Sequence, residues 1–205
     1  MNKRTLGSQG LVTSELGFGC MGLNHHRGPV KDRNEMMKVV QHAFDAGVTM
    51  FDTAEVYGPY TNEELVGEAI QTFRKEIQLA TKGGFNIKGN SYYPESKKET
   101  LRNSLEGSLK RLGTDYIDLY YIHRVDPNIP IEEVAQTMQE FKKEGKILQW
   151  GLSEASAETI RRAHHVEPLA AVQSEYSIWW RELEKEVIPT LEELKIGLVA
   201  YSPLG

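Results

Sequence analysis

Six side chains that can carry charge or form hydrogen bonds stand at the ends of successive β-rich segments of this 205-residue chain. They are Asp52, Lys82, His123, Ser153, Gln173 and Tyr201. A loop is expected to follow each of them. A parallel barrel that carries an active site draws such residues from the carboxyl ends of several strands. The sequence therefore predicts that a carboxylate, an ammonium, an imidazole and a phenol meet at one end of a barrel.

The elements that must position these residues follow one repeating unit, an amphipathic helix that ends near a glycine and leads into a short strand. In the first copy, Val40 and Phe44 lie on one helical face and Gly47 ends the helix. Glycine also ends later copies, at Gly113 and Gly145. Helices are predicted over residues 34–46, 63–73, 96–112, 131–144, 156–165 and 183–195, and strands over 16–20, 48–51, 77–80, 116–122, 147–151, 170–172 and 197–200.

Strands that alternate with helices indicate right-handed βαβ units and a parallel sheet. An open doubly wound sheet would bind its ligand at one switch point, whereas six contributing strands favour a closed ring. The predicted fold is an α/β fold, a (β/α)8 TIM barrel, with a single domain over residues 1–205. A hairpin around Ser8-Gln9-Gly10 is expected to plug one end. Because such barrels have eight strands in about 250 residues, the eighth strand and the C-terminal segment are expected beyond Gly205, in a longer natural protein.

The stretch Gly17-Phe18-Gly19-Cys20-Met21-Gly22 matches the glycine spacing of a dinucleotide-binding fingerprint, G-x-G-x-x-G. In that fingerprint a helix starts at the last glycine, but here loop-forming residues such as Gly28 and Pro29 follow. Asp45 has about the spacing of a ribose ligand, yet it lies inside a predicted helix. We favour a glycine-rich barrel strand whose loop approaches a ligand closely, with the dinucleotide fingerprint as the alternative.

Composition excludes several classes of function. The chain has 24 basic and 29 acidic residues and a net charge of −5, so it lacks the basic patch of a nucleic-acid-binding protein. No apolar run reaches the roughly 18 residues of a membrane span, and the N-terminus lacks the apolar segment of a signal peptide. Its one cysteine, Cys20, excludes an intramolecular disulfide. A cytoplasmic protein with neither nucleic acid nor membrane as a partner is expected.

Two histidine pairs, His25-His26 and His164-His165, could suggest a metal site. The first pair lies in a predicted loop and the second near the end of a predicted helix. No cysteine or suitably spaced histidine completes a ligand set, so no metal site is predicted.

Longer motifs resemble the aldo-keto reductase family and occur in that family's order along the chain. They are Gly17-Phe18-Gly19-Cys20-Met21-Gly22, Phe51-Asp52-Thr53-Ala54-Glu55-Val56-Tyr57-Gly58, Thr81-Lys82, Tyr120-Tyr121-Ile122-His123, Gly151-Leu152-Ser153 and Tyr201-Ser202-Pro203-Leu204-Gly205. The stretches 121–124 and 151–156 are most similar to the branch that contains plant perakine reductase and its bacterial relatives. The resemblance implies a barrel enzyme that reduces aldehydes or ketones with hydride from NADP(H).

The resemblance implies a catalytic tetrad of Asp52, Tyr57, Lys82 and His123. A buried Lys82 beside Tyr57 would stabilise the phenolate, and Asp52 would keep the ammonium charged and oriented. Tyr57 would give a proton to the carbonyl oxygen while hydride reaches the carbon. His123 would donate a hydrogen bond to the same oxygen. Taken singly, each residue could instead be a turn cap, a surface charge, a packed aromatic or a loop histidine.

The residues that the resemblance implies for binding the nicotinamide cofactor are Met21, Gly22, Ser153, Gln173, Tyr201, Ser202 and Leu204. Ser153 and Gln173 would hydrogen-bond the carboxamide, and Tyr201 would stack on the ring. The backbone of the first two would line the cofactor, and the last two would begin its pyrophosphate-binding stretch. At the position after Ser153 many relatives have asparagine, where this chain has Glu154.

Two other functions stay open from the sequence. The same fold serves the potassium-channel β subunits, which keep a nicotinamide mainly as a redox sensor, and a turnover assay would separate the two. Lys82 at a strand end could also form a Schiff base, as in a barrel aldolase, which borohydride trapping would reveal. Loops over 24–30, 83–95 and 124–130 are expected to shape the pocket for a small carbonyl substrate, and the segment that binds the 2′-phosphate is expected beyond Gly205.

Overall fold

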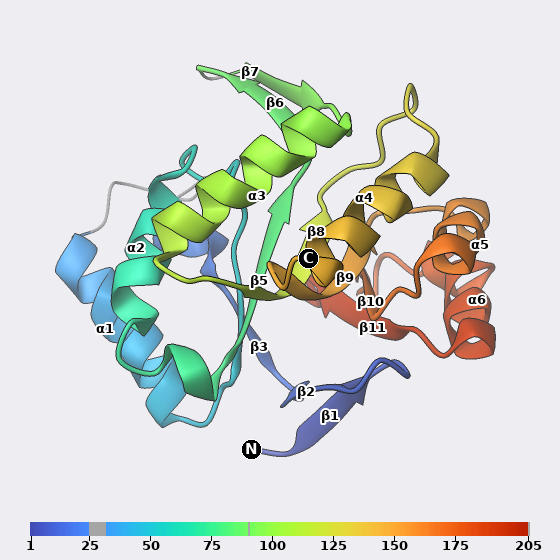
Figure 1. The fold of residues 1–205 in the computed structure, drawn as a ribbon. Helices are drawn as coiled ribbons and strands as arrows, with labels where there is room; N and C mark the ends of the chain where they lie inside the picture. Colours follow the sequence, from blue (N-terminus) through green and yellow to red (C-terminus); the bar gives the residue numbers. More distant parts are fainter. Residues whose placement is uncertain (25–31, 90, 205) are drawn as a thin grey trace.

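A seven-stranded parallel sheet is the centre of the computed structural model, which describes residues 1–24, 32–89 and 91–204. Within these residues the strands lie in the order β11–β10–β9–β8–β5–β4–β3 (Figure 1). Their bounds are β3 Gly17–Gly19, β4 Met50–Asp52, β5 Gln78–Gly83, β8 Ile117–Ile122, β9 Ile147–Ser153, β10 Ala171–Glu175 and β11 Gly197–Tyr201. All seven strands that the sequence predicted are present, shifted by up to a few residues.

Helices cover the outer face of this sheet (Figure 1). Along the chain, an α-helix comes after each of the strands β3, β4, β5, β8, β9 and β10. These helices are α1 Arg33–Asp45, α2 Thr61–Ile70, α3 Lys98–Leu112, α4 Ile131–Lys143, α5 Ala157–Val166 and α6 Val187–Leu194. Short 3-10 helices span Cys20–Leu23 (η1), Arg74–Glu76 (η2) and Glu182–Glu184 (η3). The prediction that glycines end helices is confirmed at Gly47, Gly113 and Gly145. All three have positive φ, at 92°, 62° and 72°.

The sheet is curled into a barrel wall. Strands β4 and β10 are separated by β5, β8 and β9, which would place them about 19 Å apart in a flat sheet. Yet Gln173 of β10 donates a hydrogen bond from Nε2 to Oδ2 of Asp52 in β4, at 2.9 Å. This direct contact requires the two strands to face each other across an interior. The (β/α)8 TIM-barrel prediction is confirmed, with seven of its strands in the described residues and β3 and β11 at the edges.

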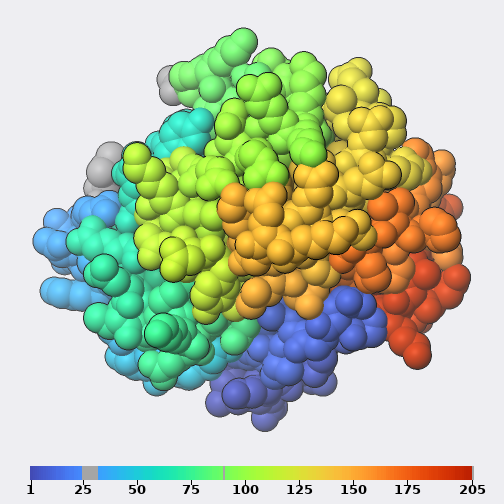
Figure 2. Space-filling view, in the orientation of Figure 1, coloured from blue at the N-terminus to red at the C-terminus, as the bar shows by residue number. Residues whose placement is uncertain are grey.

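An antiparallel hairpin of β1 (Lys3–Leu6) and β2 (Leu11–Ser14) closes the amino-terminal end of the strands, as predicted. Two hydrogen bonds attach the turn of this hairpin to the barrel. The Ser8 backbone N–H donates to the Lys195 carbonyl at 2.9 Å, and the Gln149 side chain donates to the Gln9 carbonyl at 2.9 Å. The space-filling view shows this blue segment packed against the lower end of the molecule (Figure 2). The carboxyl-terminal ends of the strands, at the opposite end of the barrel, are not covered by this hairpin.

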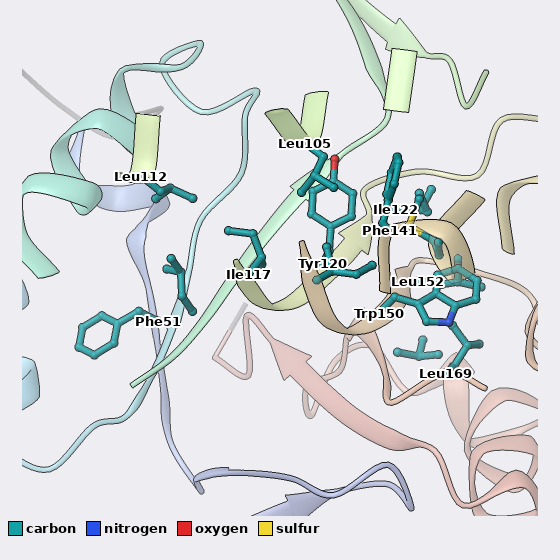
Figure 3. Packing of buried hydrophobic residues seen from close by; sticks show 14 of the residues in the cluster. Phe51, Leu105, Leu112, Ile117, Tyr120, Ile122, Phe141, Trp150, Leu152 and Leu169 are labelled. Atoms are coloured by element: carbon teal, nitrogen blue, oxygen red, sulfur yellow. The ribbon is translucent and has the colours of Figure 1, made fainter. Parts of the chain in front are cut away.

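Strand β8 is buried on both faces and shows where the core lies. Tyr120 packs in the cluster between the sheet and the helices, together with Leu105 of α3 and Phe141 of α4 (Figure 3). Its neighbours Leu119 and Tyr121 point to the other face and join the cluster that includes the hairpin. This alternation is the period of two expected for a strand covered on both sides.

Two elements differ from the prediction. The segment 83–95, predicted as a loop, contains a second hairpin of β6 (Phe85–Lys88) and β7 (Ser91–Pro94). The last predicted helix, 183–195, breaks into η3 and α6, and Lys195 rather than a glycine takes the left-handed position at its end, with φ 55°. Of the metal candidates, His25-His26 lies outside the described residues, and the His164 Nδ1 accepts the Leu169 backbone N–H at 3.1 Å.

Candidate active site

A buried ion pair lies where β4 and β5 end side by side. The Lys82 ammonium contacts the Asp52 carboxylate and also donates to the Thr53 carbonyl at 2.8 Å. Its side chain is 1% exposed. Burial by itself lowers the pKa of Lys82, but the negative charge of Asp52 and the nearby Tyr57 outweigh it and raise that pKa above its ordinary value. The lysine is therefore a fixed cation at the end of the barrel.

Tyr57 is brought to this cation by the loop after β4. Its hydroxyl lies 3.5 Å from the Lys82 Nζ. The loop is held in place because the Glu55 backbone donates to the Lys82 carbonyl at 3.1 Å and the Tyr57 backbone donates to the Ala54 carbonyl at 3.1 Å. Gly58, with φ 83°, then turns the chain toward α2.

His123 follows β8 directly and faces the same tyrosine. The two rings meet edge to face, with centroids 5.8 Å apart and planes at 86°. Burial, followed by the positive charges of Lys82 and Arg124, holds the pKa of His123 well below its ordinary value. Its buried Nδ1 has no hydrogen-bond partner among the described residues. The imidazole is thus neutral and carries one N–H that can be donated.

The four residues Asp52, Tyr57, Lys82 and His123 come together at one place although 71 positions separate the first from the last in the sequence. Each comes from the carboxyl end of a strand or the loop that follows it. The strands deliver them because β4, β5 and β8 are neighbours in the sheet. A cation, a phenol and a neutral imidazole at van der Waals and hydrogen-bond range can hold an oxygen atom and supply it with a proton.

The residues implied for the carboxamide and for the nicotinamide ring lie on the next three strands, with Ser153 at the end of β9, Gln173 within β10 and Tyr201 at the end of β11. Gln173 uses its Nε2 to hold Asp52, which leaves its carbonyl oxygen as the atom to accept from a ligand. The buried Ser153 hydroxyl accepts from Arg124 at 3.1 Å. The Tyr201 hydroxyl donates to Glu154 at 2.7 Å. These side chains thus form a second group beside the first, on β9, β10 and β11.

The remaining predicted cofactor residues lie at the two edges of the sheet. Met21 and Gly22 are half-buried in η1, immediately after β3, and a Cβ added at Gly22 would meet no heavy atom of the described residues within 4 Å. No α-helix starts at Gly22, which agrees with our preference against the dinucleotide fingerprint. Ser202 and Leu204 follow β11, and Leu204 is 86% exposed.

Buried polar residues of α2 support the site, and we did not predict them. Asn62 is fully buried, accepts from the Thr53 hydroxyl at 2.7 Å and donates to the Cys20 carbonyl at 2.9 Å. Glu63 is also fully buried and accepts from the Thr81 hydroxyl at 2.6 Å and from Arg111 at 2.7 Å. The sequence did offer a signal for them, because Asn62 and Glu63 lie in the first turn of α2, just before its buried apolar residues begin.

Glu55 and Arg124 are two further residues missed from the sequence. The Glu55 carboxylate accepts from the Ser104 hydroxyl at 3.0 Å and the Phe85 backbone at 3.3 Å, so it ties the tyrosine loop to β6. Burial outweighs these hydrogen bonds and raises the pKa of Glu55 to about 7. Arg124 donates to Ser153 and to the His123 carbonyl, at 3.1 and 2.7 Å. Arg124 directly follows the predicted His123, and Glu55 stands two positions before the predicted Tyr57.

The described residues contain neither a cluster of metal ligands nor a helix suited to crossing a membrane. No group of three metal-ligating side chains lies together in residues 1–24, 32–89 and 91–204. Over the same ranges, no helix combines the length and the apolar character that crossing a membrane requires.

Comparison with known proteins decides the family. The model of the Aldo/keto reductase family matches residues 15–205, which is nearly the whole chain. The chain belongs to the aldo/keto reductase family. The family resemblance predicted from the motifs is therefore confirmed, while the closer likeness to the perakine reductase branch stays a prediction.

Individual aldo/keto reductases resemble the chain over almost all of its length. It is 48% identical to the "Probable aldo-keto reductase 1" of Glycine max, over 98% of this chain and 58% of that relative. The holo form of an aldo-keto reductase from Bacillus halodurans superposes with a TM-score of 0.89 at 33% identity, covering 98% of this chain and 65% of that one. A glycerol dehydrogenase from Gluconobacter oxydans gives 0.87 at 31% identity, covering 97% and 62%.

A thermostable aldo-keto reductase in complex with the inhibitor epalrestat is a further neighbour, with a TM-score of 0.88 at 33% identity. All of this chain and 73% of that one are covered. The chain spans somewhat more than half of the length of the curated relative from Glycine max and less than two thirds of the Bacillus and Gluconobacter structures.

Proposed function

We propose that this aldo/keto reductase reduces the carbonyl group of small aldehydes or ketones to an alcohol, with NADP(H) as its cofactor and Tyr57 as the proton donor. One observation carries the proposal. A buried ammonium, Lys82, lies against a carboxylate on one side and 3.5 Å from the Tyr57 hydroxyl on the other. A charged lysine kept away from water stabilises the phenolate that is left when the tyrosine gives up its proton.

The proton and the hydride go to opposite ends of one C=O bond. Tyr57 donates its proton to the carbonyl oxygen as negative charge develops there. His123 is neutral and lies beside Tyr57, so its N–H can donate a hydrogen bond to the same oxygen. The product is the neutral alcohol, and the Tyr57 phenolate, stabilised by Lys82, recovers its proton from water.

The chain's own residues fit a nicotinamide cofactor. A hydroxyl, an amide and a phenol ring come from consecutive strands, with Ser153 at the end of β9, Gln173 beside it in β10 and Tyr201 at the end of β11. These are a donor and acceptor set suited to a carboxamide on a flat ring. When bound, the cofactor supplies the hydride that the carbonyl carbon receives. The preference for NADP(H) rests on the family resemblance alone.

The geometry disfavours the Schiff-base alternative. A lysine must lose its proton to attack a carbonyl, but Asp52 raises the pKa of Lys82 and occupies its ammonium together with the Thr53 carbonyl. A redox sensor would have the same fold. Only a measurement of turnover distinguishes it from a reductase.

A steady-state assay with NADPH and a panel of aldehydes and ketones tests the proposal in the intact protein. We expect multiple turnovers per active site, with one carbonyl reduced for each NADPH oxidised. Borohydride added with substrate should trap no covalent adduct on Lys82. Tight NADPH binding without turnover on any carbonyl would instead support the sensor function.

A further inference from the structure

Glu154 has a backbone conformation that its side chain does not favour. It follows β9 with φ 54°, in the left-handed region where glycine and asparagine are the usual residues. Its backbone N–H donates to the Gln173 carbonyl at 3.0 Å, so the unusual turn is fixed against β10. Such positions persist where the surrounding structure holds them, and they concentrate at functional sites.

The Glu154 side chain connects the ends of three strands. Its Oε1 accepts two hydrogen bonds, one from the Glu175 backbone at 2.8 Å and one from the Tyr201 hydroxyl at 2.7 Å. Glu154 comes from β9, Glu175 ends β10 and Tyr201 ends β11. The turn at Glu154 therefore directs a carboxylate across β10 to one particular phenol, that of Tyr201 at the end of β11.

Within residues 1–24, 32–89 and 91–204, the Tyr201 hydroxyl forms one hydrogen bond, the one to Glu154. Tyr201 is the last residue of β11 and is half-buried. Ser202 follows with φ 49°, so the chain turns away directly after it. Burial and then the hydrogen bond to Glu154 raise the pKa of Tyr201, so the phenol keeps its proton and remains a donor to the carboxylate.

We propose that Glu154 is a positioning residue that fixes the Tyr201 ring across the end of β10, ready to stack on a nicotinamide. The inference rests on the proposed function, which places that ring against the cofactor. An unrestrained phenol would have to be ordered when the cofactor binds, whereas a phenol already held by Glu154 loses less freedom at that step. Preorganisation of this kind improves the affinity for the cofactor without touching the reacting atoms.

The contact itself can be tested without cofactor, by fluorine NMR of the intact protein labelled with fluorotyrosine. Tyr201→Phe identifies the Tyr201 signal. Glu154→Ala should shift and sharpen that signal toward the value of a mobile ring, and Glu154→Gln, which keeps the acceptor oxygen, should restore it. Glu158→Ala changes a glutamate whose side chain is 82% exposed on α5, and it should have no effect. An unchanged Tyr201 signal in Glu154→Ala would overturn the inference.

The consequence for the cofactor is tested by NADPH titration of a double-mutant cycle. Glu154→Ala and Tyr201→Phe remove the same hydrogen bond, so each should weaken NADPH binding severalfold and the double variant should bind no more weakly than the weaker single variant. Glu154→Gln should bind like the unchanged protein. Fully additive losses would contradict the inference, while an unchanged protein that binds no NADPH would overturn the proposed function instead.

Discussion

The Lys82 ammonium, at the scale of single residues, is a full positive charge inside the barrel end. Removing such a charge from water costs several kcal/mol unless a partner of opposite sign is close. Asp52 is that partner, and it is held in turn by Gln173 from across the barrel. The position of Tyr57 therefore depends on a charge network in which each member keeps the next in place.

Replacing Asp52 with asparagine should destabilise the fold by about 3–5 kcal/mol at neutral pH, because it leaves a buried cation unpaired. Without the carboxylate, burial would lower the pKa of Lys82 below its unfolded value of about 10.4. Unfolding then takes up a proton, so the deficit should shrink as pH rises toward about 10. In the unchanged protein that pKa is raised, so the stabilisation from the ion pair is present below about pH 10.4 and is lost only above it.

Urea unfolding of the unchanged protein and of Asp52→Asn at several values of pH measures this deficit. Asp32→Asn is a matched control, since the Asp32 side chain caps α1 away from Lys82. A deficit for Asp52→Asn that does not change with pH would show that Lys82 stays charged without its partner.

His123 should make the protein less stable as pH falls below about 6.5. The pKa of His123 is depressed in the folded state, so the unfolded chain binds a proton that the folded state does not, and stability is lost as pH decreases. One such group contributes at most about 1.4 kcal/mol per pH unit. Unfolding midpoints should therefore fall less steeply with acid in His123→Asn than in the exposed-residue control His165→Asn. Equal slopes in the two variants would contradict a neutral, buried His123.

The hairpin of β1 and β2, at the scale of elements, supports the end of the barrel opposite to the site. Gly7 has φ 58°, and a Cβ there would lie 2.8 Å from the carbonyl oxygens of Ala170 and Lys195. Gly10 has φ 80°, but a Cβ there would meet no heavy atom of the described part of the chain within 4 Å. Gly7→Ala should lower stability by roughly 1–3 kcal/mol more than Gly10→Ala, because both variants carry the same φ penalty and only the first adds a clash.

Thermal unfolding of these two variants, with carbonyl reduction measured alongside, tests the role of the hairpin. Turnover per folded molecule should be unchanged in both, since the hairpin lies away from the tetrad. Equal stabilities would mean that the hairpin does not pack against the strand ends in solution.

The elements themselves were mostly predictable because apolar periodicity and glycine turns are local signals. The failures have local causes too. Pro189 is the third residue of α6, and a proline lacks the N–H and clashes with the carbonyl four residues before it, so a helix over 183–195 could not be continuous. Strand β7 presents Tyr92 and Tyr93, both 47% exposed, so it lacks the alternation that marks a half-buried strand.

The whole molecule explains which parts of the site could be predicted. That polar residues would meet at one end follows from parallel strands, so the location of Asp52, Lys82 and His123 was accessible from the sequence. Contacts such as Gln173 with Asp52 and Glu154 with Tyr201 depend on the curl of the sheet and on strand register. A local sequence pattern indicates neither the curl of the sheet nor the register of its strands. These contacts therefore could not be predicted from the sequence.

The central claim is that Tyr57 is the proton donor of a carbonyl reductase, and Tyr57→Phe in the intact protein tests it most directly. Losing a general acid should slow NADPH-dependent reduction of an aldehyde by about a hundred- to ten-thousand-fold. NADPH affinity, measured by fluorescence titration, should stay unchanged. Tyr60→Phe, in the same loop and 38% exposed, should keep full activity. If Tyr57→Phe kept more than about a tenth of the turnover at neutral pH, Tyr57 would not be the proton donor.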